Sequence, residues 1–361
     1  MRAYLFFQKG TNFINHLKSS GLKFLFLSTH FTETLIEKTQ LCCLEQGIEV
    51  VRINLEDLLP NAINDVQVTV TDDDVWFKVR GQVHALSEFA LVWKRRISNN
   101  FMSVGRLFES YKDSLPKYTR EQLIKEVYDL RDLILYFAQN LKIPVVNGYD
   151  PVCRNKPFQS VKAREFGLRC PSMMLSSSVE NLNAFIAKNE ASITKPIGGL
   201  GYLFEGEEVM SIKTTPVDLE YTKAITAEMT FPSFLQERIL SKYELKCILV
   251  GDELHCIKQY YAGGDIPTTD IKQAYKNKQI TNEEYHLDKS VKDKVIQLCR
   301  YFKLDLCTMD IIKSADGGYV FLEINPDGVV EYYGYFLSQS IHKRIFKMLL
   351  KKAKEPIPSL A

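Results

Sequence analysis

The first part of the chain alternates strand-like and helix-like patterns, and this alternation limits the fold most strongly. Residues 22–28 (LKFLFLS) form a short apolar run typical of a buried strand, and residues 32–47 have helical spacing that ends at Gly47. The run IEVVRIN then predicts a second strand. A strand, a helix and another strand in this order are typical of a parallel sheet, so the chain is expected to begin with an α/β domain.

The remainder predicts further α/β and α+β structure. VQVTV and VWFKV alternate apolar and polar residues around an acidic turn, which predicts a hairpin, and ALVWKRR predicts a closing strand. Residues 118–142 predict one long amphipathic helix stopped by Pro144, after which short strand-like runs alternate with turns. We expect three parts, an N-terminal domain, a central lobe and a C-terminal lobe, over residues 1–117, 118–235 and 236–361.

Composition and charge exclude several classes of protein. The 361 residues are 45% hydrophobic and 25% charged, a balance that excludes disorder for the chain as a whole. Lys plus Arg (46) nearly equals Asp plus Glu (44), so no nucleic-acid partner is expected. The eight cysteines contain no CxxC pair, and no apolar stretch approaches the ~18 residues of a membrane-spanning helix. These features favour a reduced, cytoplasmic protein without a membrane partner.

The segment TMDIIKSADGGYVFLEINPDG carries the strongest candidate for a metal site. DGG predicts a hairpin turn, so that Asp310 lies on one strand and Glu323 and Asn325 lie on its partner. Glu323 and Asn325 are two residues apart and share a face of their strand, and the hairpin brings Asp310 beside them. Two carboxylates and an amide oxygen suit Mg²⁺. A solvated polar hairpin is the alternative for this segment taken alone.

Two further segments could bind a nucleotide. Lys195 ends a predicted strand, and Gly198, Gly199 and Gly201 after it would let backbone amides approach phosphate oxygens. The run FLQERI could present backbone groups and the side-chain amide of Gln236 to an adenine edge. Taken alone, each segment could equally be a surface turn or an edge strand with solvated charges.

In this combination and order, the segments from about residue 150 to residue 350 resemble the ATP-grasp ligases. Motifs of that superfamily fall at Asn155-Lys156, Lys195-Pro196, Gln236 to Ile239 and Glu323-Ile-Asn325-Pro326. Within it the chain is most similar to the graspetide maturases, the microviridin-type and grasp-with-spasm enzymes, in WKRR, RIN, YELK and DGGYVFLEINPDG. It differs from them at Lys246 and Lys272, where Arg is common, and in the final motif, NPDGVV instead of NPxGQ.

The resemblance implies an ATP-grasp fold, with an N-terminal α/β domain before two lobes that clasp ATP. By the pattern of the family, two lysines would contact phosphates, a glycine loop would cover them, and the FLQERI segment would contact adenine. The implied ATP-binding residues are Lys156, Lys195, Gly199, Gly201, Gln236, Glu237, Ile239 and Glu244, and the implied Mg²⁺ ligands are Asp310, Glu323 and Asn325. Candidates for holding the acceptor carboxylate or the transferred phosphoryl group are Arg238, Lys246, Lys258 and Lys272. A surface position is the alternative for each of these lysines.

The resemblance also implies a reaction, the ATP-dependent ligation of a carboxylate to a hydroxyl or an amine through an acyl phosphate. In the graspetide enzymes the substrate is a ribosomally made precursor peptide, in which Asp or Glu side chains are joined to Ser, Thr or Lys side chains as macrocyclic esters or amides. Residues 94–121 are our candidate for contact with its leader, a connecting segment being the alternative. The family also leads us to expect a homodimer.

Two other functions remain open from the sequence. A RimK-like ligase that adds a free amino acid to a peptide or a small molecule would share the ATP contacts and differ in the acceptor. A non-catalytic ATP-binding scaffold or an interaction protein would not need the metal ligands. Because Asp310, Glu323 and Asn325 are all present, we expect an enzyme.

Overall fold

The computed structural model divides the chain into two compact units, one formed by residues 1–146 and 342–361 and the other by residues 147–341. The expected boundaries after residues 117 and 235 stay a prediction. Among the described helices, none combines the length and apolar character that crossing a bilayer requires. The structure describes residues 21–30, 34–58, 66–97, 115–148, 151–198, 202–205, 208–211, 214–223, 228–261 and 280–354.

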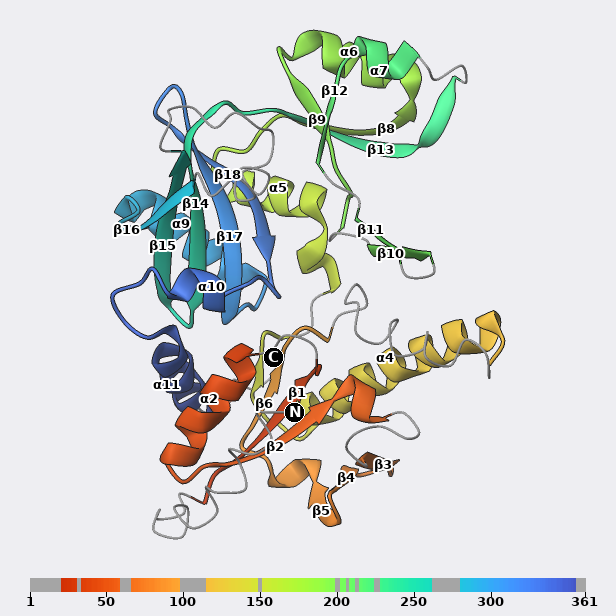
Figure 1. Cartoon of the computed structure of the whole chain (residues 1–361), viewed down its shortest axis with the longest axis vertical. Coiled ribbons are helices and arrows are strands. Elements are labelled where there is room, and N and C mark those ends of the chain that lie inside the picture. The colour runs from red at the N-terminus through yellow and green to blue at the C-terminus, as the bar shows by residue number, and fades with distance from the viewer. Residues whose placement is uncertain are drawn as a thin grey trace. The chain divides into compact units, whose positions relative to one another are not determined.

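The first unit contains a four-stranded sheet in the order β2-β1-β6-β7, with parallel neighbours (Figure 1). The predicted strand, helix and strand at its start are confirmed as β1 (Lys23–Ser28), α2 (Thr34–Glu45) and β2 (Glu49–Asn54). The other two strands are β6 (Leu91–Lys94) and β7 (Val145–Val146). The short helix η2 (Leu55–Leu58) follows β2 directly.

Helices cover this sheet, because its strands are apolar on both faces. The long predicted helix is confirmed as α4 (Lys117–Asn140), whose Ile134 and Leu135 share a core with Leu25 and Ile53 of the strands. It ends before Pro144, since Lys142 already takes a φ of 56°. Figure 1 shows α2 beside α11 (Ile341–Lys354), the helix nearest the C-terminus among the described residues.

A small antiparallel sheet and the end of β6 complete the first unit. The predicted hairpin is confirmed as β3 (Val66–Val70) and β4 (Val75–Val79), which β5 (Gln82–Ala85) and the short helix η3 (Leu86–Glu88) extend. The closing strand β6 ends at Lys94, and Arg96 takes a φ of 56°. The predicted strand ALVWKRR is therefore confirmed only as far as Lys94.

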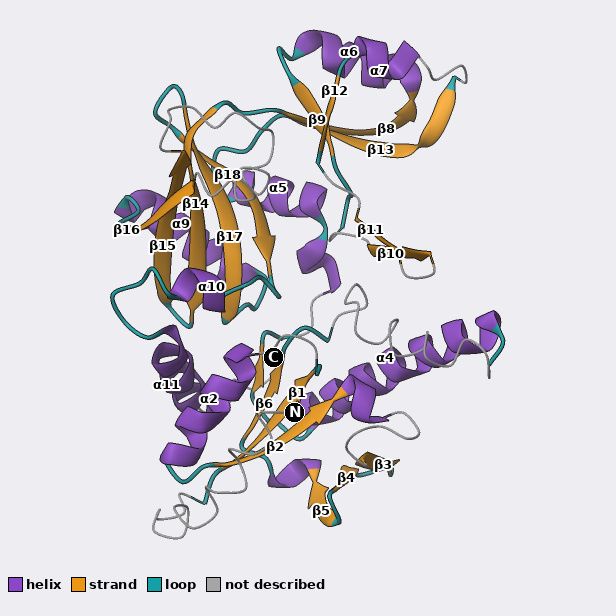
Figure 2. Ribbon diagram, viewed as in Figure 1, coloured by secondary structure: helices purple, strands orange, loops and turns teal. Residues whose placement is uncertain are grey.

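The second unit is built around a five-stranded antiparallel sheet in the order β16-β15-β14-β17-β18. Helix α9 (Lys289–Tyr301) packs on one face, where Val295 and Leu298 meet Leu245 and Leu249 of β14. Figure 2 shows α9 behind this sheet and the short helix α10 (Glu331–Gly334) in front of it. The strands are β14 (Ser241–Val250), β15 (Glu253–Tyr261), β16 (Ile280–Tyr285), β17 (Leu306–Ser314) and β18 (Tyr319–Asn325).

A smaller sheet in the order β12-β9-β13-β8 belongs to the same unit. Helix α6 (Val179–Lys188) packs on one face of it, with Phe185 against Leu235 of β13 (Figure 1). The strands are β8 (Met173–Ser178), β9 (Ser192–Thr194), β12 (Thr215–Val217) and β13 (Met229–Glu237). Other elements are η4 (Pro151–Arg154), α5 (Lys156–Glu165), α7 (Leu219–Lys223) and the hairpin of β10 (Tyr202–Glu205) and β11 (Glu208–Ser211).

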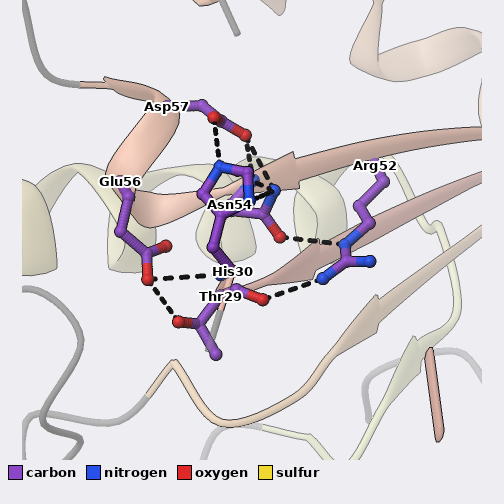
Figure 3. Close-up of polar contacts among 6 residues, drawn as sticks. All are labelled: Thr29, His30, Arg52, Asn54, Glu56 and Asp57. Atoms are coloured by element: carbon purple, nitrogen blue, oxygen red, sulfur yellow. Dashed lines mark hydrogen bonds and ion pairs between the residues drawn. The ribbon is translucent and has the colours of Figure 1, made fainter. Parts of the chain in front are cut away.

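Polar side chains gather where β1 and β2 of the first unit end. Figure 3 shows six of them, Thr29, His30, Arg52, Asn54, Glu56 and Asp57. His30 Nε2 lies 2.6 Å from Asp57 Oδ1, and Asn54 Nδ2 donates to Asp57 Oδ2 over 2.8 Å. The hydrogen bond to Asp57 raises the pKa of His30. Burial alone would raise the pKa of Asp57, but the hydrogen bonds from His30 and Asn54 lower it.

We predict that the His30–Asp57 pair stabilises the protein most in mildly acidic solution. The cationic His30 stabilises the fold below the ordinary histidine pKa of ~6.5 and loses this effect as pH rises through its higher folded value. The carboxylate of Asp57 contributes above ~3.9 and is lost as pH falls. His30→Gln should therefore cost about 0.5–1 kcal/mol at pH 5.5 and less at pH 9, since the side chain of His30 is 34% exposed and solvent screens the pair in part. Urea unfolding at both pH values measures this.

The exposed His286 offers a matched control, because His286→Gln should cost less than about 0.5 kcal/mol at either pH, as for a surface substitution. If the loss of unfolding free energy caused by His30→Gln were larger at pH 9 than at pH 5.5, the stabilising role of the cationic His30 would be contradicted.

Candidate active site

The hairpin of β17 and β18 brings the three predicted metal ligands together. Asp310 lies directly opposite Glu323, and Thr308 lies opposite Asn325. The two carboxylates and the amide therefore occupy one face of the hairpin, as the sequence predicts. Within the described part of the chain, no three His, Cys, Asp or Glu side chains cluster so that they could hold a metal by themselves. This site instead combines two carboxylates with one amide oxygen.

Each carboxylate of the hairpin has a lysine partner. Lys246 of β14 lies opposite Asp310 in the sheet, and its ammonium group pairs with Asp310 Oδ1. Lys156 Nζ, at the start of α5, lies 3.4 Å from Glu323 Oε2. The four side chains are largely buried, so their charges interact more strongly than they would in water. The result is a balanced group of two cations and two anions on one sheet face.

Lys246 is held in its charged form. Burial by itself would lower its pKa, but the carboxylate of Asp310, with smaller contributions from Tyr333 and Glu323, raises that pKa above the ordinary lysine value. The ring of Tyr333 on α10 lies 5.5 Å from Lys246 Nζ, measured to the ring centroid. Lys246 therefore offers a fixed positive charge beside the carboxylates.

Helix α5 is fastened to the free edge of β18. The side chain of Asn155 caps the helix by accepting from the Phe158 amide over 2.9 Å. The buried side chain of Gln159 then pairs with the backbone of Ile324, donating from Nε2 to its carbonyl over 2.9 Å and accepting from its amide at Oε1 over 2.8 Å. Gln159 thus replaces a neighbouring strand, and it fixes Lys156 beside Glu323.

Lys195 belongs to the same charge group, although it follows β9 of the small sheet. Its pKa is lowered to about 8, mainly by burial and in smaller part by Lys156, against the opposing effects of Glu323 and Asp310. The backbone amide of Lys156 donates to the Ile197 carbonyl over 2.9 Å, which ties the Lys195 segment to the start of α5. Three lysines and two carboxylates therefore influence one another here.

Gln236 lies on β13, on the face of the small sheet that points away from α6. Leu235 packs against α6, and side chains alternate along a strand, so Phe234 and Gln236 share the opposite face. Lys195 Nζ lies 5.9 Å from the centroid of the Phe234 ring, which places the lysine on that face too. Gln236 is only 1% exposed, and its Nε2 has no hydrogen-bond partner among the described residues. A buried donor of this kind is costly unless a ligand or water accepts from it.

Lys258 points away from this site, so the register of the sheet does not support its expected acceptor role. In the sheet Lys258 pairs with Leu245, which packs in the core against α9, whereas Lys246 faces the opposite side. Its Nζ lies 2.9 Å from Glu283 Oε1 and 4.5 Å from the centroid of the Tyr260 ring. The sequence analysis did not use the register that separates the two lysines.

At the strand exit after Gln236, the side chain of Glu237 is bound to Ser172. Glu237 Oε2 accepts from the amide and the hydroxyl of Ser172, over 3.0 Å and 2.8 Å, and alternation turns its side chain away from that of Gln236. The Glu237 carboxylate is therefore held away from the Gln236 side chain, and the expected nucleotide contact of Glu237 stays a prediction. The amide of Arg238 donates to the Ala191 carbonyl over 3.0 Å, and Ile239 and Glu244 are partly buried.

Three predicted residues, Gly199, Gly201 and Lys272, lie outside the described residues. Conversely, the sequence analysis missed Gln159. A glutamine inside an amphipathic helix carries no signal for a strand-capping role, and the one available hint is its place three residues after the capping and lysine pair Asn155-Lys156.

No protein-family model matches the chain, and no curated protein matches it. Solved structures do resemble it over nearly their whole length. An ATP-grasp ligase from Chryseobacterium gregarium, RiPP-associated and solved with ADP and a leader and core peptide, has a TM-score of 0.77 at 19% identity and covers 94% of this chain and 100% of its own. The macrocyclase MdnC from Microcystis aeruginosa MRC, bound with the precursor peptide MdnA, has a TM-score of 0.73 at 21% identity, covering 91% and 100%.

A third similar structure is the ATP-grasp ligase PsnB, solved with a variant of its minimal precursor, Mg and ADP. It has a TM-score of 0.68 at 18% identity and covers 94% of this chain and 100% of its own. These likenesses confirm the predicted ATP-grasp fold, with mixed α/β and α+β structure. At this level of identity they establish the fold alone.

We predict that Lys195 titrates near pH 8, below an ordinary lysine, because burial disfavours its charged form. In competitive acetylation with mass-spectrometric detection, its reactivity should rise through about pH 8 as the neutral amine forms. Glu323→Gln removes a carboxylate that raises this pKa and should move the midpoint to lower pH.

Lys162 is a suitable comparison, because its hydrogen bond to Glu165 raises its pKa. Its midpoint should lie above that of an ordinary lysine. A Lys195 midpoint equal to or above that of Lys162 would contradict the buried, charge-coupled position.

We predict that Gln159→Leu destabilises the protein by about 2–4 kcal/mol, because the backbone amide and carbonyl of Ile324 would stay buried without partners. Chemical denaturation measures the loss. Val161→Ala, at an exposed position on the same helix, should change the stability by less than about 0.5–1 kcal/mol. Equal effects of the two substitutions would show that the Gln159 bonds contribute little.

Proposed function

We propose that the chain is an ATP-dependent ligase that forms macrocyclic ω-ester or ω-amide links between side chains of a ribosomal precursor peptide. One observation carries this proposal. Asp310 and Glu323 lie opposite each other on the hairpin, each with a lysine partner, and Lys195 from the small sheet is electrostatically coupled to both. Cations beside paired carboxylates are the parts that phosphoryl transfer needs, since its catalysis is mainly positioning and charge neutralisation.

The donor chemistry of the hairpin fits Mg²⁺. Asp310, Glu323 and Asn325 would hold it through hard oxygen atoms and leave further positions to phosphate and water. When bound, the ion would neutralise charge on the β- and γ-phosphates. A bound ion would draw Glu323 away from Lys156 and weaken their ion pair. Lys156 would then be able to face a phosphate.

The other residues of the site would hold ATP from the two sheets. Lys156 and Lys195 would pair with phosphate oxygens, and the buried amide of Gln236 would donate to the adenine ring. The expected contacts of Ile239 with adenine and of Glu244 with the ribose remain part of the proposal. The proposal also keeps Gly199 and Gly201 in the loop that would cover the phosphates, and Arg238 and Lys272 as residues that would hold the acceptor.

Lys246 is our candidate for the reacting end of ATP, because it is charged and lies beside Asp310. In the first step an oxygen of the acceptor carboxylate bonds to the γ-phosphorus, and the bond to the β–γ bridging oxygen breaks, releasing ADP. In the second step a hydroxyl or amine attacks the acyl carbon, loses its proton and expels phosphate. Lys246 would stabilise negative charge on the transferred group.

The peptide acceptor is supported by the ligands of the similar structures. The Chryseobacterium gregarium enzyme was solved with a leader and core peptide, and MdnC with its precursor. We keep residues 94–121 as the proposed leader contact, of which residues 98–114 lie outside the described residues. A homodimer and a cytoplasmic location complete the proposal.

Co-expression with the short peptides encoded beside the gene tests this function. A peptide that loses one water per ring, with ATP converted to ADP, is the expected result in mass spectrometry. A peptide that instead gains the mass of an amino acid would contradict macrocyclisation and identify an amino-acid ligase.

We predict that Glu323→Gln and Asn325→Ala each abolish ADP release in the presence of the precursor peptide that the wild type cyclises. Glu323→Gln removes the charge of one oxygen ligand, and Asn325→Ala removes another ligand altogether. Lys258→Gln is the matched control, since Lys258 faces the other side of the sheet and should leave the rate within about twofold, as for a surface substitution. Continued activity of both site variants would show that the hairpin is not the metal site.

A further inference from the structure

The chain turns sharply after β18, and this turn is held against β17. The Asp327 amide donates to Asn325 Oδ1 over 3.1 Å, and the Gly328 amide donates to the Asn325 carbonyl over 3.2 Å. Gly328 lies so close to Thr308 that a Cβ at this position would clash with the Thr308 side chain. The turn of residues 325–328 therefore has one well-defined place beside the proposed metal ligands.

The amide of Asp327 also orients the side chain of Asn325. Because a backbone N–H donates to Oδ1, the amide oxygen of Asn325 faces the turn and its nitrogen faces away. The oxygen has a second lone pair that can coordinate a cation. Any shift of Asp327 would therefore move or rotate the one neutral ligand of the proposed site.

An ion pair connects this turn to the segment before α5. The guanidinium of Arg154 pairs with Asp327 Oδ2, and their side chains are only 27% and 14% exposed. Arg154 ends η4, one residue before the helix cap Asn155 and two before Lys156. The pair thus joins the chain that carries Asn325 to the chain that carries Lys156, at a point separate from the Gln159 bonds to Ile324.

We propose that Arg154 and Asp327 are a pair of positioning residues that set the spacing between the metal ligand Asn325 and the phosphate-binding Lys156. This proposal rests on the proposed function. Asp327 stands at the variable position of the NPxGQ pattern, and the proposal gives this residue a role that the pattern itself does not assign. Neither residue touches the metal or the nucleotide; both act through the groups they hold.

Magnesium-dependent ADP binding tests the proposal without the peptide. ADP is titrated into the purified full chain by calorimetry at rising MgCl₂ concentrations, and the Mg²⁺ concentration that gives half-maximal affinity is determined. Asp327→Asn and Arg154→Gln should each raise that concentration about tenfold, since loss of a group that orients a metal ligand commonly lowers metal affinity by roughly 10–100-fold. Thermal unfolding verifies that each variant is folded.

The charge reversal Arg154→Asp with Asp327→Arg should return the Mg²⁺ requirement to within about threefold of the wild type, because the two substitutions act on one contact. The exposed pair Arg300–Asp252, with N–O distance 2.8 Å, supplies the control. Arg300→Gln and Asp252→Asn should leave the requirement unchanged.

Single variants with the Mg²⁺ requirement of the wild type would overturn the proposal, as would a charge reversal no better than either single variant. Both of these results would leave the proposed function standing, since the wild type would still bind ADP with magnesium. A wild type that binds no ADP at any MgCl₂ concentration would overturn the proposed function and the positioning role together.

Discussion

The attraction between lysines and carboxylates on one sheet face is the interaction on which the proposed chemistry depends. Lys246 and Asp310 are cross-strand neighbours, and Lys156 reaches Glu323 from a helix. None of these buried charges would be tolerated alone, because removing an ion from water costs several kcal/mol unless a counter-ion compensates. Because the lysines and carboxylates of this sheet face balance each other, the face could bind a negatively charged triphosphate together with a divalent cation.

Both sheets of the second unit contribute residues to this site. The large sheet carries the carboxylates and Lys246, and the small sheet carries Gln236 and, at the end of β9, Lys195. Helix α5 joins them, because Gln159 is bound to β18 while the Lys156 amide is bound to Ile197. A nucleotide held from both sheets would thus be fixed at its base and at its phosphates by groups far apart in the sequence.

The sequence predicts the local elements well and their relative placement less well. The hairpin of Asp310 and Glu323 could be predicted, because a DGG turn and strand alternation fix which side chains face each other. The opposite orientations of Lys246 and Lys258 depend on the pairing of β14 with β15, and the sequence analysis did not derive that register. Gln159 and Arg154 contact partners that lie 165 and 173 residues away in the sequence, and no local pattern indicates such contacts.

The capped edge of β18 also limits how two copies of this chain could associate. Strands at the border of a sheet commonly serve as templates for another chain. Here the backbone of Ile324 is taken by Gln159, and the Phe321 amide donates to the Arg169 carbonyl over 2.8 Å. A second copy could not extend the sheet at β18 without first displacing α5, and that displacement would dismantle the site itself. Assembly by strand addition at this border and catalysis would therefore be mutually exclusive.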